Sequence, residues 1–300
     1  MNLRQLEYFI AIADEGSFRA AAEKVRVAPP SLSQQIRVLE AEVGGPLFER
    51  LARGSRLTPA GRALLPDARA AVLSARRGGR AARAALALEQ AELEVATVLS
   101  LAVGLLPGAI ERLYLAYPGI AVRLHEYQHR DALVRAVDDG IGDIAVGPAP
   151  PAREGPIVEL GHERFVAIVG PRHPAFASPA AVRIGALADD DWILFPAWHG
   201  LHGLVSAICA HAGFAPRDAI TTAQVEAAVR LAAGGLGVAI VPANIVPPQL
   251  EAHVQELDPP VFRVLYAYSR AEWSPQARAL LTALEEEPWP TLPPGAVVLD

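Results

Sequence analysis

One predicted helix in this sequence carries a polar face whose side chains suit recognition of DNA. Within residues 29–43, PPSLSQQIRVLEAEV, an apolar stripe recurs at helical spacing and comprises Leu32, Ile36, Leu39 and Val43. The opposite face presents Pro30, Ser33, Gln34 and Arg37. Hydroxyl, amide and guanidinium groups bind base edges, and a small helix fits the DNA major groove. The pattern indicates a recognition helix, with an ordinary amphipathic surface helix as the alternative.

Two shorter elements must hold that helix in place. Residues 3–13 repeat apolar side chains on one face and predict a helix that forms the floor of the domain. Ser17 follows Gly16, so one helix can end at the glycine and another can begin with Ser17 as its N-cap. Residues 26–28 leave room only for a sharp turn, after which Pro29 and Pro30 suit a first helical turn. The spacing predicts two helices joined by a tight turn.

Three arginines follow on a predicted hairpin. Residues 47–50 and 56–57 indicate two short strands around residues 53–55. Arg50, Arg53 and Arg56 on this wing are placed to reach phosphates or the minor groove, and solvated surface charge is the alternative.

A long helix is expected after the wing. Thr58 and Pro59 form a helix start, with threonine as N-cap and proline at the first helical position. A narrow seam of small and apolar residues follows, made of Leu64, Ala68, Ala71 and Ala75. Such a seam favours a partner helix, most simply its copy in a homodimer. Pro66 and Gly78 predict a kink or weak point.

Residues 1–61 resemble the N-terminal winged helix-turn-helix of LysR-type transcriptional regulators. The resemblance is carried in order by NLRQLEYFIAIADEGSFRAAAEKV, PPSLSQQIRVLEAEVG, LFER and RLTPAG. This chain has Ala28 and Pro29 where members usually have Ser-Gln, and Gln34 where they often have Arg. The resemblance implies a DNA-binding set of Ser17, Arg19, Pro29, Pro30, Ser31, Ser33, Gln34, Arg37, Arg50, Arg53 and Arg56.

From about residue 92 the pattern changes to short apolar strands that alternate with helices. This alternation predicts βαβ units and a mostly parallel sheet. Polar residues that follow strands are candidates for ligand binding, because open α/β sheets bind ligands where strands end. Ser100 and Thr222 follow strands of different predicted lobes, and simple helix capping is the alternative for each.

The second half of the chain is similar to the effector domain of the same family, which is like a periplasmic binding protein. The carrying motifs are Ser100, Leu106-Pro107, Tyr117-Pro118-Gly119, GDIA at 142–145, His173-Pro174 and GLG at 235–237 before Pro242. The resemblance implies two lobes with a cleft between them. The expected effector-binding residues are Ser100, Leu101, Gln128, His129, Pro148, Trp198, His199, Thr222 and Gln224.

The predicted ligand is a small, partly apolar organic anion. Helix N-termini behind Ser100 and Thr222 favour a carboxylate. His129 and His199 are expected to add a proton-dependent contact, because histidine titrates near neutral pH.

Metal binding and catalysis are both disfavoured. His199, His202, Cys209 and His211 lack the tight paired spacing of structural zinc sites. No Gly-x-Ser-x-Gly nucleophile elbow or lysine-containing phosphate loop occurs, and GGLG at 234–237 lies before a predicted strand rather than after one. No cofactor, metal or enzymatic activity is therefore expected.

The charge of the 300-residue chain is distributed unevenly. Its net charge is −6, yet residues 1–90 carry +5 and the remainder carries −11. Such asymmetry suggests a nucleic-acid module joined to a different module. The sequence has no apolar run long enough for a membrane span, no secretion signal and one cysteine, which together predict a cytoplasmic protein without disulfides.

These observations predict a multi-domain α+β protein. It comprises an α-rich winged helix-turn-helix at 1–58, a linker helix at 59–90 and a two-lobed α/β effector domain at 91–300, of the type 2 periplasmic-binding-protein kind. Lobe 1 is expected at about 91–161 and 268–300, and lobe 2 at about 162–267. The predicted function is a non-enzymatic transcriptional regulator, dimeric or tetrameric, that binds an operator and a small effector and contacts RNA polymerase. The alternative is a small-molecule receptor whose N-terminal helices serve only assembly.

Overall fold

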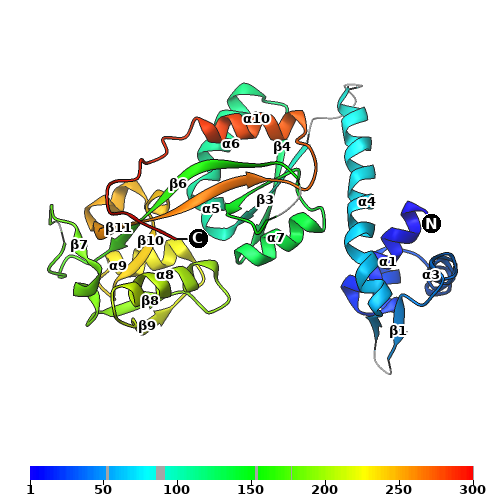
Figure 1. Ribbon diagram of the computed structural model, residues 1–300, viewed down its shortest axis with the longest axis horizontal. Helices are drawn as coiled ribbons and strands as arrows, with labels where there is room; N and C mark the ends of the chain where they lie inside the picture. Colours follow the sequence, from blue (N-terminus) through cyan, green and yellow to red (C-terminus); the bar gives the residue numbers. More distant parts are fainter. Residues whose placement is uncertain (52–53, 86–91, 153–154, 177, 300) are drawn as a thin grey trace. The chain divides into compact units, whose positions relative to one another are not determined.

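The computed structural model describes residues 1–51, 54–85, 92–152, 155–176 and 178–299 (Figure 1). The chain divides into two compact units. The first consists of Met1–Ala91 with Asp138–Ile141, and the second consists of Glu92–Val137 with Gly142–Asp300.

The first unit contains the predicted helix-turn-helix and wing. Its elements are α1 (Leu3–Glu15), α2 (Phe18–Lys24), α3 (Pro29–Val43), β1 (Phe48–Arg50), β2 (Ser55–Leu57) and α4 (Pro59–Ala85). Ser17 caps α2 as predicted, since its hydroxyl accepts a hydrogen bond from the Ala20 amide. Asn2 and Gln5 form a reciprocal capping box at the start of α1. The wing docks on the end of α1 through a hydrogen bond from the Ser55 amide to the Gly16 carbonyl.

The apolar stripe of α3 forms the centre of this unit's core. Leu32, Ile36 and Leu39 are at most 1% exposed, as predicted. Val43 is 45% exposed, so its assignment to the buried stripe is wrong. It is the last residue of α3, which ends where Gly44 adopts a left-handed conformation.

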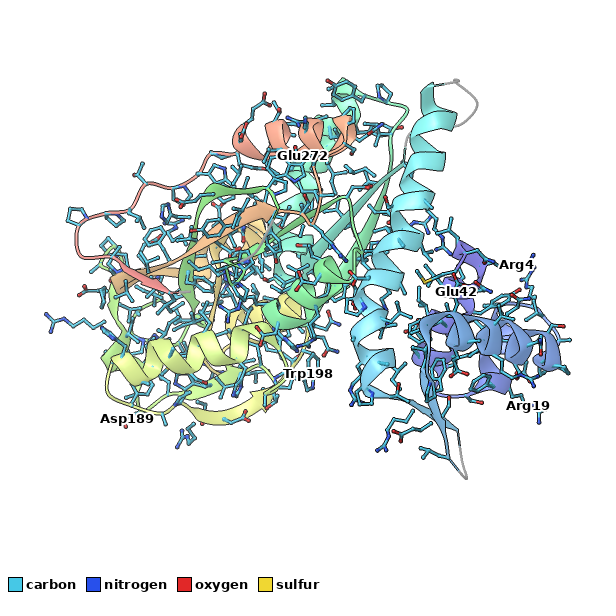
Figure 2. All side chains as sticks on the ribbon, turned by 45° about the vertical axis from the view of Figure 1, so that its right-hand side comes forward. Arg4, Arg19, Glu42, Asp189, Trp198 and Glu272 are labelled. Atoms are coloured by element: carbon cyan, nitrogen blue, oxygen red, sulfur yellow. The ribbon has the colours of Figure 1, made fainter. Side chains whose placement is uncertain are left out.

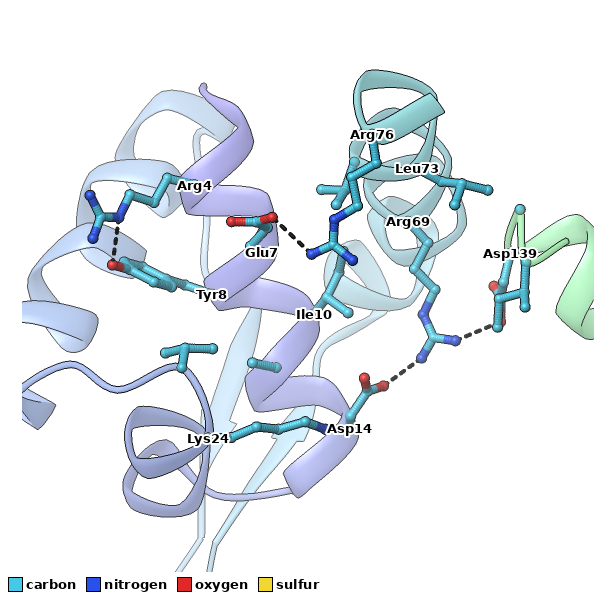
Figure 3. A pocket seen from close by; sticks show the side chains of 15 residues that line it. Arg4, Glu7, Tyr8, Ile10, Asp14, Lys24, Arg69, Leu73, Arg76 and Asp139 are labelled. Carbon is cyan, nitrogen blue, oxygen red and sulfur yellow. Dashed lines mark hydrogen bonds and ion pairs between the residues drawn. The ribbon is translucent and has the colours of Figure 1, made fainter. Parts of the chain in front are cut away.

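Helix α4 packs on α1 and carries the residues expected to mediate dimerisation. Ion pairs join Glu7 to Arg76 and Asp14 to Arg69, at 2.9 and 2.6 Å (Figure 3). Ala68 is buried in the helix-turn-helix core, and Leu64 packs against the same core. Only Ala71 and Ala75 of the predicted seam are exposed. The seam is therefore divided, because its first half already has a partner within the chain.

The second unit alternates strands with helices. Its strands are β3 (Glu92–Val98), β4 (Ala121–Tyr127), β5 (Ile144–Pro148), β6 (Ile157–Ile168), β7 (Val182–Arg183), β8 (Asp191–Leu194), β9 (Arg217–Thr221), β10 (Ala239–Pro242), β11 (Val254–Tyr268) and β12 (Val297–Leu299). Its α-helices are α5 (Leu99–Gly104), α6 (Leu106–Ala116), α7 (Arg130–Asp138), α8 (Gly200–His211), α9 (Val225–Ala233) and α10 (Pro275–Glu285). The short strands β7 and β12 were not predicted from the sequence, whereas a helix beginning near Ser100 was expected and is α5.

The main sheet is mixed, which corrects the expectation of a mostly parallel sheet. Its order is β10-β6-β11-β5-β3-β4, with β7 and β12 attached to β11. The pairs β3–β4 and β3–β5 are parallel, whereas β6 and β11 pair antiparallel with each other and with their neighbours β10 and β5. The long β6 and β11 were predicted only in part, because their outer segments alternate with polar residues and lack a continuous apolar run.

Two separate hydrophobic cores define two lobes within this unit. One core takes its buried residues from 93–160 and 265–284, and the other takes them from 165–261. Strands β6 and β11 run through both lobes (Figure 1). The chain passes from one core to the other between residues 160 and 165 and returns between 261 and 265. Among the described residues, no helix is long and apolar enough to cross a membrane.

Two glycines of α4 provide a matched test of packing. An added Cβ at Gly61 would lie 2.3 Å from the Leu47 carbonyl oxygen, whereas one at Gly78 would meet nothing within 4 Å. We expect Gly61→Ala to lower the free energy of unfolding by about 1–3 kcal/mol through overpacking. Gly78→Ala should raise it by about 0.5–1 kcal/mol, because alanine favours the helix. Urea unfolding measures both, and shifts of the same sign would contradict this packing.

Candidate functional sites

The outer face of α3 lies open to solvent. Pro29, Pro30, Ser31, Gln34 and Arg37 are exposed, and Ser33 is half-buried. The helix begins with no side-chain cap at Ala28, and its first two residues are prolines without an N–H group. This end of α3 therefore offers apolar rings where a helix usually offers backbone donors.

The candidate arginines differ in how they are engaged. Arg19 lies on the surface (Figure 2). It pairs with Glu23 at 3.3 Å, and Arg56 pairs with Glu49. Arg53 lies outside the described residues. Within the part of the chain that the structure describes, no carboxylate is paired with Arg37. Gln35, which the sequence did not single out, accepts a hydrogen bond from the Gln5 amide and links α3 to α1.

A cavity of about 460 Å³ lies in the second unit, where the two lobes meet. It is lined by residues that follow strands of both lobes, together with the first turns of α7 and α8 and one residue of β11. The lining comprises Val98, Leu99, Ser100, Gln128, His129, Arg130, Asp131, Pro148, Ala197, Trp198, His199, Gly200, Leu201, Gly203, Leu204 and Arg263.

Six predicted effector residues meet at this cavity and three do not. Ser100, Gln128, His129, Pro148, Trp198 and His199 line it. Leu101 is fully buried in the core of the first lobe. Thr222 and Gln224 are outside the lining, and the Thr222 hydroxyl accepts a local hydrogen bond from the Gln224 amide. Thr222 therefore stabilises its own turn and neither reaches the cavity nor caps α9, whose N-cap is Gln224 and has no side-chain cap.

The cavity contains a buried arginine that sequence reasoning missed. Arg263 is 4% exposed and donates from Nε to Glu163 at 2.8 Å and from Nη2 to the Ser100 hydroxyl at 3.2 Å. Glu163 is also buried and accepts from Asn244 at 3.2 Å. The signal that could have revealed Arg263 is a charged residue inside the apolar run VFRVLYAY.

A backbone hydrogen bond joins the lobes beside the cavity. The Gly200 amide donates to the Gln128 carbonyl at 2.8 Å. A Cβ at Gly200 would lie 3.2 Å from that same oxygen, so glycine permits the approach. Trp198 next to it is 47% exposed at the cavity rim (Figure 2). The cavity is therefore enclosed on one side by contact between the lobes.

His199 does not supply the proton-dependent contact that was expected near neutral pH. It is 4% exposed, and burial together with the positive charge of Arg263 lowers its pKa to about 4. Its ring stacks on Phe195 at 4.8 Å. His199 is therefore neutral at physiological pH, and the expectation is wrong for this residue.

The residues considered as zinc ligands are hydrogen-bonded within the protein or buried. His199 Nδ1 accepts from the Leu201 amide, and His202 Nδ1 lies 2.8 Å from the Phe195 carbonyl. Cys209 is buried, and burial raises the pKa of its thiol to about 12. In the described ranges no three His, Cys, Asp or Glu side chains are grouped as metal ligands.

Comparison with protein families identifies both units. Residues 3–62 match the bacterial regulatory helix-turn-helix protein model of the lysR family, and residues 87–289 match the LysR substrate binding domain. The chain belongs to the LysR family. It is a DNA-binding transcriptional regulator with an effector-binding domain, and its relatives are regulators rather than enzymes. The alternative of a receptor whose N-terminal helices serve only assembly is thereby disfavoured.

Individual LysR-family relatives extend over most of the chain. ClcR from Pseudomonas putida is 34% identical, covering 82% of this chain and 84% of the relative. A full-length OxyR variant from Pseudomonas aeruginosa has a TM-score of 0.69 and 25% identity, covering 95% of each chain. Full-length CbnR, solved with its target DNA, has a TM-score of 0.64 and 27% identity, covering 95% of this chain and 99% of that one.

The low pKa of His199 predicts a pH dependence of stability. The folded pKa is about 4 and the ordinary value is 6.5, so the unfolded chain binds the extra proton between these values. The contribution of His199 to stability is present above pH 6.5 and is lost as the pH falls toward 4, by about 3 kcal/mol. Between pH 7 and pH 4, the free energy of unfolding should fall by about 3 kcal/mol less in His199→Asn than in the wild-type protein. Urea unfolding at both pH values measures this difference. Equal pH dependence in both proteins would show that His199 titrates normally.

Proposed function

We propose that the exposed face of α3 reads the operator in the major groove and that the wing contacts phosphates or the minor groove. The support is the exposure of the polar residues of α3 while its apolar stripe is buried. Arg37 suits guanine, because guanidinium groups bind guanine O6 and N7, and Gln34 suits adenine. Pro29 and Pro30 suit thymine methyl groups, because they offer apolar surface and no donor.

Arg37 is the sharpest test of this DNA surface. Arg37→Ala should weaken operator binding by about 1–3 kcal/mol if the guanidinium reads a base edge. Arg217→Ala is the matched control, because Arg217 is an exposed arginine of the second unit that pairs with Asp191. Gel shifts at several salt concentrations measure both variants. Unchanged affinity of a folded Arg37→Ala protein would remove Arg37 from the interface.

We also propose that two subunits pair through α4 to form a homodimer. Assembly of two such dimers into a tetramer is the alternative oligomeric state. Exposed Ala71 and Ala75 support this proposal, because small side chains let helices approach closely. Ala71→Asp would bury an unpaired charge, so the dimer dissociation constant should rise about 100-fold, or roughly 3 kcal/mol. Ala60→Asp in the first turn of the same helix is the control. Light scattering that finds Ala71→Asp as fully assembled as the control would place the interface elsewhere.

The cavity between the lobes is proposed as the effector site, and a small organic anion as its ligand. The observation that carries this proposal is the buried Arg263 beside Ser100 in a half-open cavity of suitable size. Ligand binding would favour one arrangement of the two lobes. That change would alter the arrangement of subunits on DNA and their contact with RNA polymerase. A cytoplasmic location agrees with this function. Thermal-shift screening of organic acids, followed by gel shifts with each hit, tests the proposal.

A further inference from the structure

Arg26 has a backbone conformation that favours glycine. It lies in the turn between α2 and α3 with a φ of 55°. Among the described residues, Arg26 is the one residue other than glycine whose φ is positive. A side chain with a Cβ makes this left-handed conformation costly, because the Cβ approaches the following carbonyl oxygen. Residues held in such conformations cluster at functional sites, so Arg26 is a candidate for one.

The hydrogen bonds around Arg26 form a motif in which this position is usually glycine. The Val27 amide donates to the Ala22 carbonyl at 3.0 Å, and the Arg26 amide donates to the Glu23 carbonyl at 3.2 Å. This pair of hydrogen bonds defines the Schellman motif at the end of a helix. Glycine would fit the turn with less strain than arginine, so the stability of the turn does not explain the arginine.

The side chain of Arg26 is not used within the protein. Val25 and Val27 pack against the core of the first unit, whereas Arg26 between them is exposed. Lys24 in the same region is engaged, because it pairs with Glu15 at 2.6 Å. In the part of the chain that the structure describes, no acceptor is bound to the guanidinium of Arg26. This positive charge is therefore available to a partner outside the chain.

The start of α3 lacks the backbone donors with which helices usually bind phosphates. A helix N-terminus binds phosphate through N–H groups that have no partner inside the helix. Pro29 and Pro30 have no N–H group, and the Ser31 amide donates to the Ala28 carbonyl at 3.0 Å. A guanidinium in the turn just before α3 would supply a full positive charge where these donors are missing.

We propose that Arg26 binds a DNA phosphate beside the recognition helix and thereby compensates for the missing backbone donors of α3. This inference rests on the proposed function of α3 and adds a contact from outside its polar face. A phosphate is the expected partner, because Arg26 precedes the helix that is proposed to enter the groove. Phosphate contacts fix the position of a protein on the duplex and carry no sequence information.

Three substitutions separate the charge of Arg26 from its backbone conformation. Arg26→Gln and Arg26→Lys both keep a long side chain in the left-handed conformation, and only lysine keeps the charge. Arg26→Gly removes the charge and relieves the strain, so it should raise the melting temperature by about 2–5 °C. A residue retained for the stability of the turn would give the opposite result, a lower melting temperature in Arg26→Gly.

DNA binding of the full-length variants is measured by fluorescence anisotropy at several salt concentrations. The probes are a duplex that the wild-type protein selects from random-sequence DNA, and poly(dI-dC). Arg26→Gln and Arg26→Gly should lower the slope of log affinity against log salt by about 0.9 per bound subunit on both probes. At about 0.15 M salt this slope corresponds to a roughly fivefold loss of affinity per subunit. Arg26→Lys should keep the wild-type slope.

Arg217→Ala is the control for loss of an exposed arginine, because Arg217 lies in the second unit and pairs with Asp191. It should bind both probes as the wild-type protein does. The assignment of Arg26 is overturned by a wild-type slope in Arg26→Gln and Arg26→Gly, by a loss confined to the selected duplex, or by an equal loss in Arg26→Lys. A lower melting temperature in Arg26→Gly also overturns it.

This proposal and the proposed base reading by α3 fail separately. Weaker binding by Arg37→Ala, together with wild-type binding by the Arg26 variants, refutes only the phosphate contact of Arg26. Wild-type binding by Arg37→Ala, together with a lowered salt slope in Arg26→Gln and Arg26→Gly, refutes only the base contact of Arg37.

Discussion

The antiparallel pairing of β6 with β11 is the constraint on which the effector domain depends. Both strands contribute residues to the two hydrophobic cores, so each lobe is connected to the other through the same ladder. Glu163 and Arg263 lie directly opposite each other in its register, and their side chains form a buried ion pair. Removing one partner of such a pair costs about 3–5 kcal/mol, because the other charge stays buried. The pairing thus holds the register where the lobes meet.

That ion pair also shapes the cavity that is proposed as the effector site. Arg263 faces the cavity lining and Ser100, while Glu163 is bound on its other side by Asn244. The charge that would recognise an anion is therefore positioned by a structural contact and does not depend on a flexible surface side chain. The same positive charge, added to burial, keeps His199 neutral. Arg263 therefore serves both the buried ion pair and the proposed recognition of an anion.

The DNA-binding unit is stabilised mainly by apolar packing. Its recognition helix has no side-chain cap and begins with two prolines, so its position depends on burial of Leu32, Ile36 and Leu39 and on the Gln5–Gln35 contact. Helix α4 completes this support, because Ala68 and Leu64 pack into the same core. What remains exposed on α4, including Ala71 and Ala75, is available for a partner. The proposed pairing of subunits uses this exposed part of α4, while the buried part supports the fold.

The sequence by itself determined the elements that rest on local signals. The helix-turn-helix, the wing and the cap at Ser17 follow from periodicity, turns and capping over short distances. The cavity residues Ser100 and Gln128 follow from their positions after strands, and His199 follows from the family resemblance. Only the tertiary structure decided the rest. Whether Ala68 faces a partner or its own core, whether Thr222 reaches the cavity, and whether His199 titrates near neutral pH all depend on residues distant in sequence. Arg263 is the clearest case, because its charge is tolerable only where the fold brings Glu163 opposite it, and that pairing spans 100 residues of chain.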